Sequence, residues 1–527
     1  MSSPANSSSS LPTQQFARHI GGFSLATLFS RILGYLRDAL VVAHFGGGRL
    51  SDTYYAAFRI ANLVRRTLGE GALTASFVPI LEKERQKSSE SAQAFFGSLW
   101  SGLVLVCGLL VILGILASRP LVLALTYGFT ADPAKFDLTV QLTRILFPHL
   151  LFVTMAAAAQ GALNVARRFF LPALAPITFS LSLIVYLLLL KQGIFPKLTP
   201  QGQIMGLALC AVIGGALEWL ILLPPLFRAG FRLEFRNPWS HPGVKQVLLL
   251  MGPSILGLMV DQVDTLIEMT FASFMHEGAF TAIYNANRIM QLPLALFGVA
   301  TASVALPHLS QKLGQKDMVQ YRETLGLSLR LLGFVLIPAS VGLLLLSLPI
   351  VQTLFQHGQF TLQQSLITHQ ALFFAAWGLL AFSLIRIAVI SFFSLEDAIT
   401  PVKVNLLEIT LNAILCYALM RPMGVGGLTL AASLSSWVSV LLLFKILSDR
   451  IGGLPLASVF QSWTRTTLAS LGMALFLWEF RKMASLPPWA LTFASMPLAL
   501  TLYLGLARLL HMEEVGILAS IFRRKNQ

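Results

Sequence analysis

The chain has 527 residues, of which 55% are hydrophobic and 12% charged, whereas about 25% of residues are charged in an ordinary soluble protein. A mean hydropathy of +0.73 and continuous apolar runs of about 20 residues indicate a polytopic helical membrane protein. They exclude a soluble enzyme with one anchor. The net charge of +15 indicates basic cytoplasmic loops, not nucleic-acid binding, and it favours an anionic substrate.

The amino-terminal stretch MSSPANSSSSLPTQQ is rich in serine and uncharged, and it lacks the basic region and cleavage site of a signal peptide. Residues 1–23 are therefore predicted to be a disordered cytoplasmic tail, with the first span acting as an uncleaved signal anchor. The three cysteines, Cys107, Cys210 and Cys416, each lie inside an apolar run without metal-ligand spacing. They are expected to pack as small apolar residues and to form no disulfide.

Hydropathy predicts about fourteen membrane-spanning helices. Their expected starts lie near Ser24, Ser51, Phe95, Leu138, Pro172, Ile204, Val247, Thr281, Leu325, Leu366, Thr400, Val425, Trp463 and Pro488. An even number of spans puts both termini on one side of the membrane. The loops on that side carry most of the lysines and arginines, including the stretches 83–87 and 228–245. Both termini are therefore predicted to be cytoplasmic.

The first two spans, within residues 24–70, carry charged side chains inside apolar runs. A charge at the bilayer centre costs about 3 kcal/mol, so these side chains are expected to face a wet cavity or one another. With about 3.6 residues per turn, Arg31 and Asp38 share one helix face, and Ser30 and Arg37 lie beside it. A second polar set lies on the next helix: Asp52, Arg59, Asn62, Arg65 and Arg66. Alternatively, these are interfacial charges that extend to lipid head groups.

The chain also shows an internal repeat. ASFVPILEKERQK resembles ASVALPHLSQKLGQK, and their prolines, Pro79 and Pro307, are 228 positions apart. LNVARRFFLPALAPITFSL resembles FFSLEDAITPVKVNLLEITL, with Pro172 and Pro401 separated by 229 positions. Because the offset covers six spans, two parallel six-helix lobes are predicted, with a site between the halves. The alternative is that spans look alike by composition.

The second half adds polar residues within predicted spans, such as Arg288 and Arg386. Arginine suits bidentate contact with phosphate oxygens. One consistent interpretation is an anionic substrate that meets five arginines: Arg31, Arg37, Arg59, Arg65 and Arg288.

Acidic residues lie on two further spans. Asp261, Asp264 and Glu268 share a face of the seventh span, and Glu408 and Asn412 lie one turn apart on the eleventh. Asp264, Glu408 and Asn412 therefore form a candidate site for a coupling cation, with sodium and a proton both fitting. The alternative is that these acids pair with the arginines.

Motifs for direct ATP use or catalysis are not found in the sequence. It contains no GxxxxGK[ST] loop, no HExxH and no Cys/His metal set, so an enzyme is not expected and no cofactor is predicted. The last two spans, within residues 460–510, stand outside the repeat. They are either additional packing helices or the walls of a lipid-facing groove.

Several motifs along the chain form a recognisable set. They begin with SRILGYLRDALVVAHFG and DTYYAAFRIANLVRRTLGEGALTASFVPIL, and they continue with MGPSILG, NRIMQLPLALFGVATASVALPHLS, FQHGQFT and TPVKVN. Together these motifs resemble the MurJ (MviN) family of lipid II flippases, in the MOP transporter superfamily, and the resemblance covers essentially the whole chain. The family implies fourteen helices, two six-helix lobes around a cationic cavity, and two extra helices that form a groove for the undecaprenyl tail.

The resemblance also implies which residues line the cavity. By position they are Ser30, Arg31, Arg37, Asp38, Asp52, Asn62, Arg65 and Arg288, with Arg59 where a lysine is common. Asn287 and Gln291 flank Arg288 where some relatives carry acids, so the sequence departs from the family at a salt-bridge latch through these positions.

The resulting prediction is an all-α membrane transporter that moves lipid II from the cytoplasmic to the periplasmic leaflet by alternating access. Its expected parts are the tail 1–23, lobes at 24–230 and 245–450, groove helices at 460–510 and a cytoplasmic tail at 511–527. The expected drive is sodium, protons or membrane potential. The expected setting is the bacterial inner membrane during cell-wall biogenesis, with lipid II, membrane lipids and cell-wall synthesis proteins as partners and no nucleic acid. Two alternatives are a multidrug or cation antiporter of the same superfamily and a non-transporting scaffold for cell-wall assembly.

Overall fold

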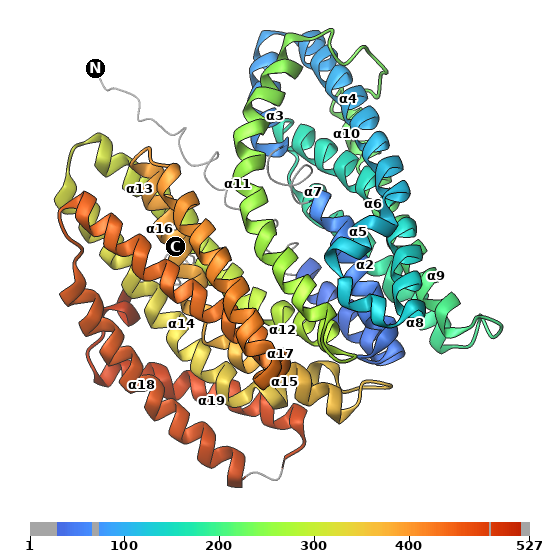
Figure 1. Ribbon diagram of the computed structural model, residues 1–527. Helices are drawn as coiled ribbons and strands as arrows, with labels where there is room; N and C mark the ends of the chain where they lie inside the picture. The colour runs from blue at the N-terminus through green and yellow to red at the C-terminus, as the bar shows by residue number, and fades with distance from the viewer. Residues whose placement is uncertain (1–28, 66–72, 484–485, 518–527) are drawn as a thin grey trace, which may run out of the picture. The chain divides into compact units, whose positions relative to one another are not determined.

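The structure is a computed structural model that describes residues 29–65, 73–483 and 486–517 (Figure 1). The predicted tail 1–23 and residues 518–527 of the predicted carboxyl-terminal tail lie outside these described residues, as do Arg66 and the predicted first-span start at Ser24. The described residues are all-helical, with 86% of them in helices and none in a strand. The chain divides into two compact units, Met1–Gln262 and Val263–Gln527, and the division falls inside one helix, α11.

The first unit begins with a helix at residues 29–45. Its further helices are α2 (Arg49–Arg65), α3 (Leu73–Lys87), α4 (Ser89–Leu116), α5 (Ser118–Leu125), η2 (Tyr127–Ala131), α6 (Pro133–Val165), α7 (Phe170–Leu174), α8 (Pro176–Lys191), α9 (Pro200–Leu220), α10 (Leu223–Arg228) and the first part of α11 (Pro242–Ser273). The helix at 29–45 ends where Gly46 takes a positive φ of 71°, a conformation that favours glycine.

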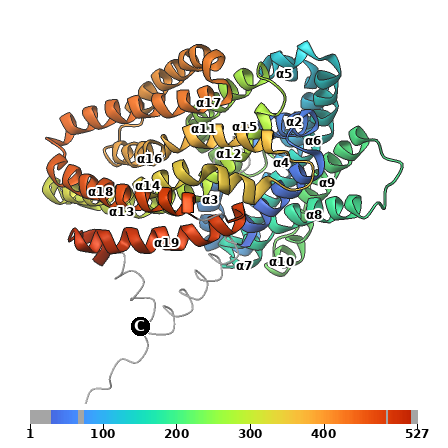
Figure 2. The ribbon, with the colours of Figure 1, turned by 90° about the horizontal axis from the view of Figure 1, so that it is seen from below.

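The second unit contains the rest of α11 and nine further helical elements named here. They are α12 (Ala279–Pro293), the π-helical turn η3 (Leu294–Val299), α13 (Ala300–Gly314), α14 (Met318–Phe355), α15 (Leu362–Ala376), α16 (Leu379–Ser394), α17 (Ile399–Ile451), α18 (Leu456–Met483) and α19 (Pro488–Leu509). Helices α18 and α19 run beside each other and both contact α14 (Figures 1 and 2).

The predicted spans correspond to these helices. Helix α17 has 53 residues and covers two predicted spans. Gly424, with φ 57° and ψ −134°, interrupts the helix between these two spans. By length and hydropathy alone, seven of the described helices could cross a membrane, or eight if α15 and α16, bent by 43°, form one span. The helix at 29–45 and α2 are not among them, and both carry several charges within their described residues. About fourteen membrane-spanning helices is consistent with the structure.

The two sequence-repeat segments fold alike. Helices α3 and α13 each have 15 residues, and each contains its repeat proline, Pro79 or Pro307. In the first unit, α3, α4 and α6 enclose a core of large apolar side chains, including Phe77, Phe95 and Trp100. Helix α6, which packs in this core, also contacts α2.

Candidate functional site

The helix at residues 29–45 carries four predicted site residues. Ser30 is half-buried and Arg31 is exposed, whereas Arg37 and Asp38 are 8% and 1% exposed. Arg37 folds onto Asp38, with Nη2 at 2.6 Å and Nε at 2.8 Å from Oδ1. Each ion is thus a counter-ion of the other, as buried charges require. Arg31 is the exposed cation of this helix.

One aromatic ring covers the Arg37 guanidinium, and two further rings pack against that ring. Its Cζ lies 5.1 Å from the ring centroid of Phe179 on α8, a distance typical of a cation–π contact. Phe179 stacks on Phe58 of α2 at 6.0 Å and lies 5.1 Å from the imidazole of His149 on α6. Gly215 lets α9 pack closely against the His149 ring, because a Cβ added at this glycine would lie 2.5 Å from Nδ1 of His149. Sequence analysis did not identify these aromatic positions.

Asp52 lies in the interior of the first unit. Nζ of Lys135 on α6 is 2.9 Å from Oδ2 of Asp52, and the two side chains are 7% and 1% exposed. The Lys135 ammonium also lies 4.2 Å from the ring centroid of Phe129. Asp132 caps α6 by accepting from the backbone N–H of Ala134 and Lys135, which fixes the first turn that presents this lysine.

The remaining predicted residues of the first unit follow one another along α2. Arg59, Asn62 and Arg65 are all half-buried. The Asn62 amide donates to the Phe58 carbonyl at 2.8 Å, and its Oδ1 accepts from Nε of Arg65 at 2.5 Å. Asn62 therefore orients Arg65. The structure brings these three residues together on the second half of α2, whereas Asp52 lies deeper in the packed unit.

A polar stripe on α6 adds a cation that sequence analysis missed. Asp137, Gln141 and Arg144 are all exposed, and their spacing of four and three residues puts them on one face. Arg144 lies well inside a helix of 33 residues whose apolar part is long enough to span a membrane. The sequence contains a signal for Arg144, because this arginine lies six positions inside the span predicted to start near Leu138. A charge at this position is costly in lipid.

In the second unit, Arg288 lies on α12 and is half-buried. Its Nη1 donates to Oε1 of Gln291 at 3.5 Å, and the neighbouring Asn287 donates to Oε1 of Glu268 at 2.8 Å. Both neutral residues that depart from the family pattern thus take part in hydrogen bonds, one of them with Arg288 itself.

The three candidate residues for a coupling cation also lie in this unit. Oδ1 of Asp264 accepts from the Asn412 amide at 3.2 Å, and Oε1 of Glu408 accepts from the Ser436 hydroxyl at 2.6 Å. Glu408 and Asn412 are 8% and 5% exposed, and Asp264 is half-buried. The atoms of these side chains that would bind a cation are oxygens, which suit a hard cation such as sodium. Among the described residues, no group of three or more His, Cys, Asp or Glu side chains forms a metal site. Nothing is described of the Asp261 side chain.

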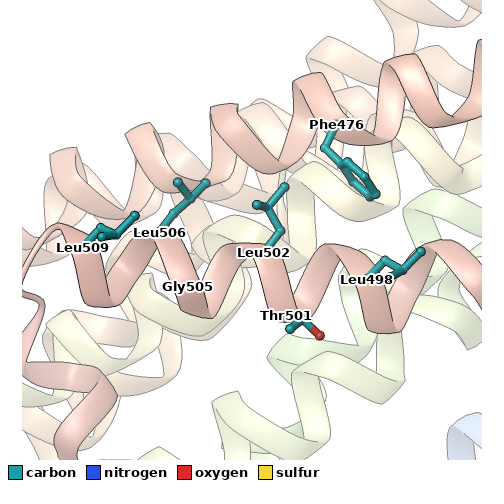
Figure 3. A pocket seen from close by; sticks show the side chains of 7 residues that line it. All are labelled: Phe476, Leu498, Thr501, Leu502, Gly505, Leu506 and Leu509. Atoms are coloured by element: carbon teal, nitrogen blue, oxygen red, sulfur yellow. The ribbon is translucent and has the colours of Figure 1, made fainter.

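Helices α18 and α19 form an apolar pocket of about 560 Å³ (Figure 3). Its lining residues are Phe476, Leu498, Thr501, Leu502, Gly505, Leu506 and Leu509. All of them except Thr501 and the bare glycine backbone are hydrocarbon or aromatic side chains. The two helices outside the sequence repeat therefore carry a surface on which an apolar chain could lie.

Two units of membrane-spanning helices, with arginines on polar faces and an apolar pocket on the last two helices, define a polytopic membrane transporter. The sequence profile of the lipid II flippase MurJ family matches residues 41–499. This chain belongs to that family.

Individual relatives agree with this assignment. The lipid II flippase MurJ of Burkholderia cenocepacia is 31% identical over 526 residues, covering 96% of this chain and 98% of that one. The probable lipid II flippase MurJ of Buchnera aphidicola is 31% identical over 81% of this chain and 83% of its own length.

Two solved structures share the fold. A MurJ lipid II flippase structure has a TM-score of 0.75 and 24% identity over 93% of this chain and 99% of that chain. A multidrug transporter of the MATE family, in the MOP superfamily, has a TM-score of 0.64 and 13% identity over 80% of this chain and 94% of its own. At these identities the similarity concerns the fold.

Proposed function

We propose that this membrane protein is a lipid II flippase that moves the undecaprenyl-diphosphate-linked peptidoglycan precursor from the cytoplasmic to the periplasmic leaflet by alternating access. It acts as a transporter and not as an enzyme. The observation that carries the proposal is the presence of arginines on polar faces of membrane-spanning helices, in a chain whose relatives are named lipid II flippases. Such charges suit an anionic head group and have no use on a purely structural lipid-facing surface.

The head group is proposed to bind to the accessible arginines. Arg31 is exposed, and Arg59, Arg65 and Arg288 are half-buried, so part of each side chain reaches the surface of the protein. Arginine matches a diphosphate better than lysine does, because its planar fork donates two parallel hydrogen bonds. Arg37 is not proposed to bind the head group directly, since its charge is paired with Asp38 and covered by Phe179. Its proposed contribution is to the electrostatic potential and to the shape of the site.

The polyprenyl tail is proposed to lie in the pocket on α18 and α19. Each methylene removed from water contributes about 0.8 kcal/mol, so a long hydrocarbon chain would not be drawn through a polar cavity. A lining of leucines with Phe476 and Gly505 offers a continuous apolar surface instead. The amphipathic substrate would thus meet two chemically distinct surfaces of the chain.

The energy source is proposed to be a cation gradient or the membrane potential. Asp264, Glu408 and Asn412 would hold sodium or a proton through their oxygen atoms. Moving one elementary charge across the membrane provides about 2.3 kcal/mol per 100 mV. The proposed setting is the bacterial inner membrane, with both termini cytoplasmic and cell-wall synthesis proteins as partners.

The decisive experiment depletes the chromosomal protein in a bacterial host and measures which leaflet exposes lipid II. Wild-type chain supplied in trans should restore exposure on the periplasmic side. Arg31→Ala and Arg288→Ala should insert normally but fail to restore it, because each removes a cation from the proposed head-group site. Arg119→Ala is the matched control, since Arg119 is an exposed cation paired with Asp137 at 3.2 Å and should support normal transport. Wild-type transport by either test variant at normal abundance would contradict the head-group assignment.

A further inference from the structure

The segment between α10 and α11 is held against α4 although it has no regular secondary structure. The Gln93 side chain pairs with the backbone of Arg232 twice: its Nε2 donates to the carbonyl and its Oε1 accepts from the N–H, both at 2.9 Å. Further along, the N–H of Arg236 donates to the Ser101 hydroxyl at 2.9 Å. The two α4 anchors, Gln93 and Ser101, are eight positions apart, so the docked segment follows α4 for about 12 Å.

Small residues on α4 form the seat for this segment. A Cβ added at Gly97 would lie 3.3 Å from both Cδ of Arg236 and the carbonyl oxygen of Glu234, and one at Gly102 would lie 3.4 Å from Cβ of Pro238. The hydroxyl groups of Ser98 and Ser240 are 2.9 Å apart. The segment is therefore fixed by its backbone, which leaves its larger side chains to face outward.

Two large aromatic side chains project from the docked segment. Phe235 is 79% and Trp239 is 71% exposed, whereas Phe231 at the start of the segment is 4% exposed and packs in the core. Trp239 lies at the tip of a turn in which its N–H donates to Oδ1 of Asn237 at 3.0 Å. Exposure of this size on a held segment indicates a surface that contacts something apolar outside the chain.

The same stretch is strongly basic. Residues 228–245 contain four cations, Arg228, Arg232, Arg236 and Lys245, and a single acid, Glu234. Glu234 is bonded to Arg236 at 2.7 Å. The hydrogen bond from Arg236 is the main reason why the pKa of Glu234 is lowered, and it outweighs the loss of hydration, which acts to raise that pKa. Arg228 and Arg232 are exposed cations in the same stretch of chain as the two outward aromatic rings.

We infer that residues 228–240 form a membrane-surface site for an acidic phospholipid head group. Arg228 and Arg232 would contact the phosphate, and Phe235 and Trp239 would enter the boundary between head groups and acyl chains. Tryptophan favours this boundary, and clustered cations beside a membrane span bind anionic lipid. Charge and position favour lipid over a protein partner, because the segment lies along the first turns of a membrane-spanning helix. The site is separate from the proposed transport site, and the inference does not depend on the transported substrate.

The test uses the full chain in lipid nanodiscs of phosphatidylcholine. A bromine-labelled phosphatidylglycerol or phosphatidylcholine is added at equal mole fraction, since bromine quenches tryptophan at contact. The Trp239 signal is obtained as the difference between wild-type chain and Trp239→Phe. We expect the acidic lipid to be preferred over phosphatidylcholine by more than about tenfold at this site, because each surface cation contributes roughly a fivefold factor at an anionic membrane.

The double variant Arg228→Gln/Arg232→Gln should reduce this preference to near one. Lys191→Gln/Lys197→Gln is the matched control, since it removes two exposed cations of the same unit and should keep the preference. Thermal unfolding verifies that both variants remain folded.

Three results would overturn the inference: equal quenching by both lipids, an equal loss of preference in the control variant, or no quenching of Trp239 by either lipid. The last result would indicate that the aromatic pair meets water or a protein partner.

Discussion

Nζ of Lys135 lies 2.9 Å from Oδ2 of Asp52, and the two side chains are 7% and 1% exposed. The residues are 83 positions apart, so this ion pair joins α2 to α6 in the interior of the first unit. A buried pair is costly to form, but removal of one partner leaves the other charge unmatched and destabilises the fold much more. Asp52, which the family resemblance places in the cavity, is thus held by a structural partner.

The first prediction concerns this pair. Asp52→Asn and Lys135→Met should each lower the free energy of unfolding by about 3–5 kcal/mol, and the double variant should recover most of the loss. Thermal unfolding of the purified chain measures the effect. Asp137→Asn is the control, because the Arg119–Asp137 pair is exposed and should contribute at most about 1 kcal/mol. Abolished transport with unchanged stability in Asp52→Asn would instead make Asp52 a substrate contact.

The second prediction concerns Arg144, the exposed cation of the α6 stripe. If Arg144 contacts the substrate head group, Arg144→Ala should slow lipid II transport by roughly 10- to 100-fold, the equivalent of losing one hydrogen bond to a charged group. Arg144→Lys should retain more activity than Arg144→Ala. The transport assay in reconstituted vesicles provides the measurement, with Arg119→Ala as control. Unchanged transport and increased stability in Arg144→Leu would show that this arginine faces lipid.

The third prediction separates two glycines of the last helix pair. An added Cβ at Gly472 would lie 2.7 Å from Cδ1 of Leu506, whereas nothing lies within 4 Å of one at Gly505. Gly505 also lines the pocket, so Gly505→Phe should fill it without forcing the helices apart. Transport of the full-length lipid should fall by about 30-fold, on the basis of roughly 2 kcal/mol for an apolar side chain, while a short-chain analogue is bound normally.

A matched control exists for this substitution on α4. Gly108 also has nothing within 4 Å of an added Cβ, so Gly108→Phe adds the same bulk away from the pocket. It should leave transport unchanged. Equal losses in both variants, or equal losses for long and short lipids, would rule out the pocket as the tail site.

The fourth prediction concerns ion coupling. Asp264→Asn and Glu408→Gln should change the response of transport to sodium, pH or membrane potential more than the affinity for the substrate. The reason is that each substitution removes a negative charge that would balance the cation. Ser436→Ala is the matched control, because it removes the 2.6 Å hydrogen bond to Glu408 and keeps the carboxylate. An unaltered response to all three variables in both acid variants would refute a coupling role.

The fifth prediction concerns acid stability. Hydrogen bonds from Lys87 and Ser91, at 2.7 and 2.6 Å, hold the pKa of Glu84 below its ordinary value of 4.5. Because the folded state favours the ionised form, Glu84 stabilises the fold above the unfolded pKa. This contribution is lost as pH falls below 4.5 and through the lowered folded pKa. The difference in unfolding temperature between wild-type chain and Glu84→Gln should be constant near neutral pH and shrink in acid.

Glu82→Gln removes a charge from the same helix and serves as the control for net charge. A difference between wild-type chain and Glu84→Gln that persists unchanged from neutral pH to pH 3 would contradict the assignment. The measurement is made on the purified full chain in detergent.

Much of the architecture could be predicted from the amino-acid sequence, because the free energy of inserting a helix into a membrane depends mainly on the residues of that helix. Apolar runs of span length predict where helices lie, and charges inside such runs mark polar faces whichever helices pack around them. Arg31, Arg59 and Arg65 could be singled out in this way. Arg144 carried the same local signal, an arginine well inside a predicted span, and was overlooked.

Only the tertiary structure decided which charges remain accessible, since pairing and burial depend on residues far apart in the chain. Asp52 finds its counter-ion on α6, Arg37 is covered by a ring from α8, and Glu408 meets Ser436 across the bend at Gly424. A sequence pattern places a residue on a helix face, but the free energy of a buried charge is set by what that face packs against. The sequence by itself thus determined a helical transporter with charged faces, and packing determined which of those charges can reach a substrate.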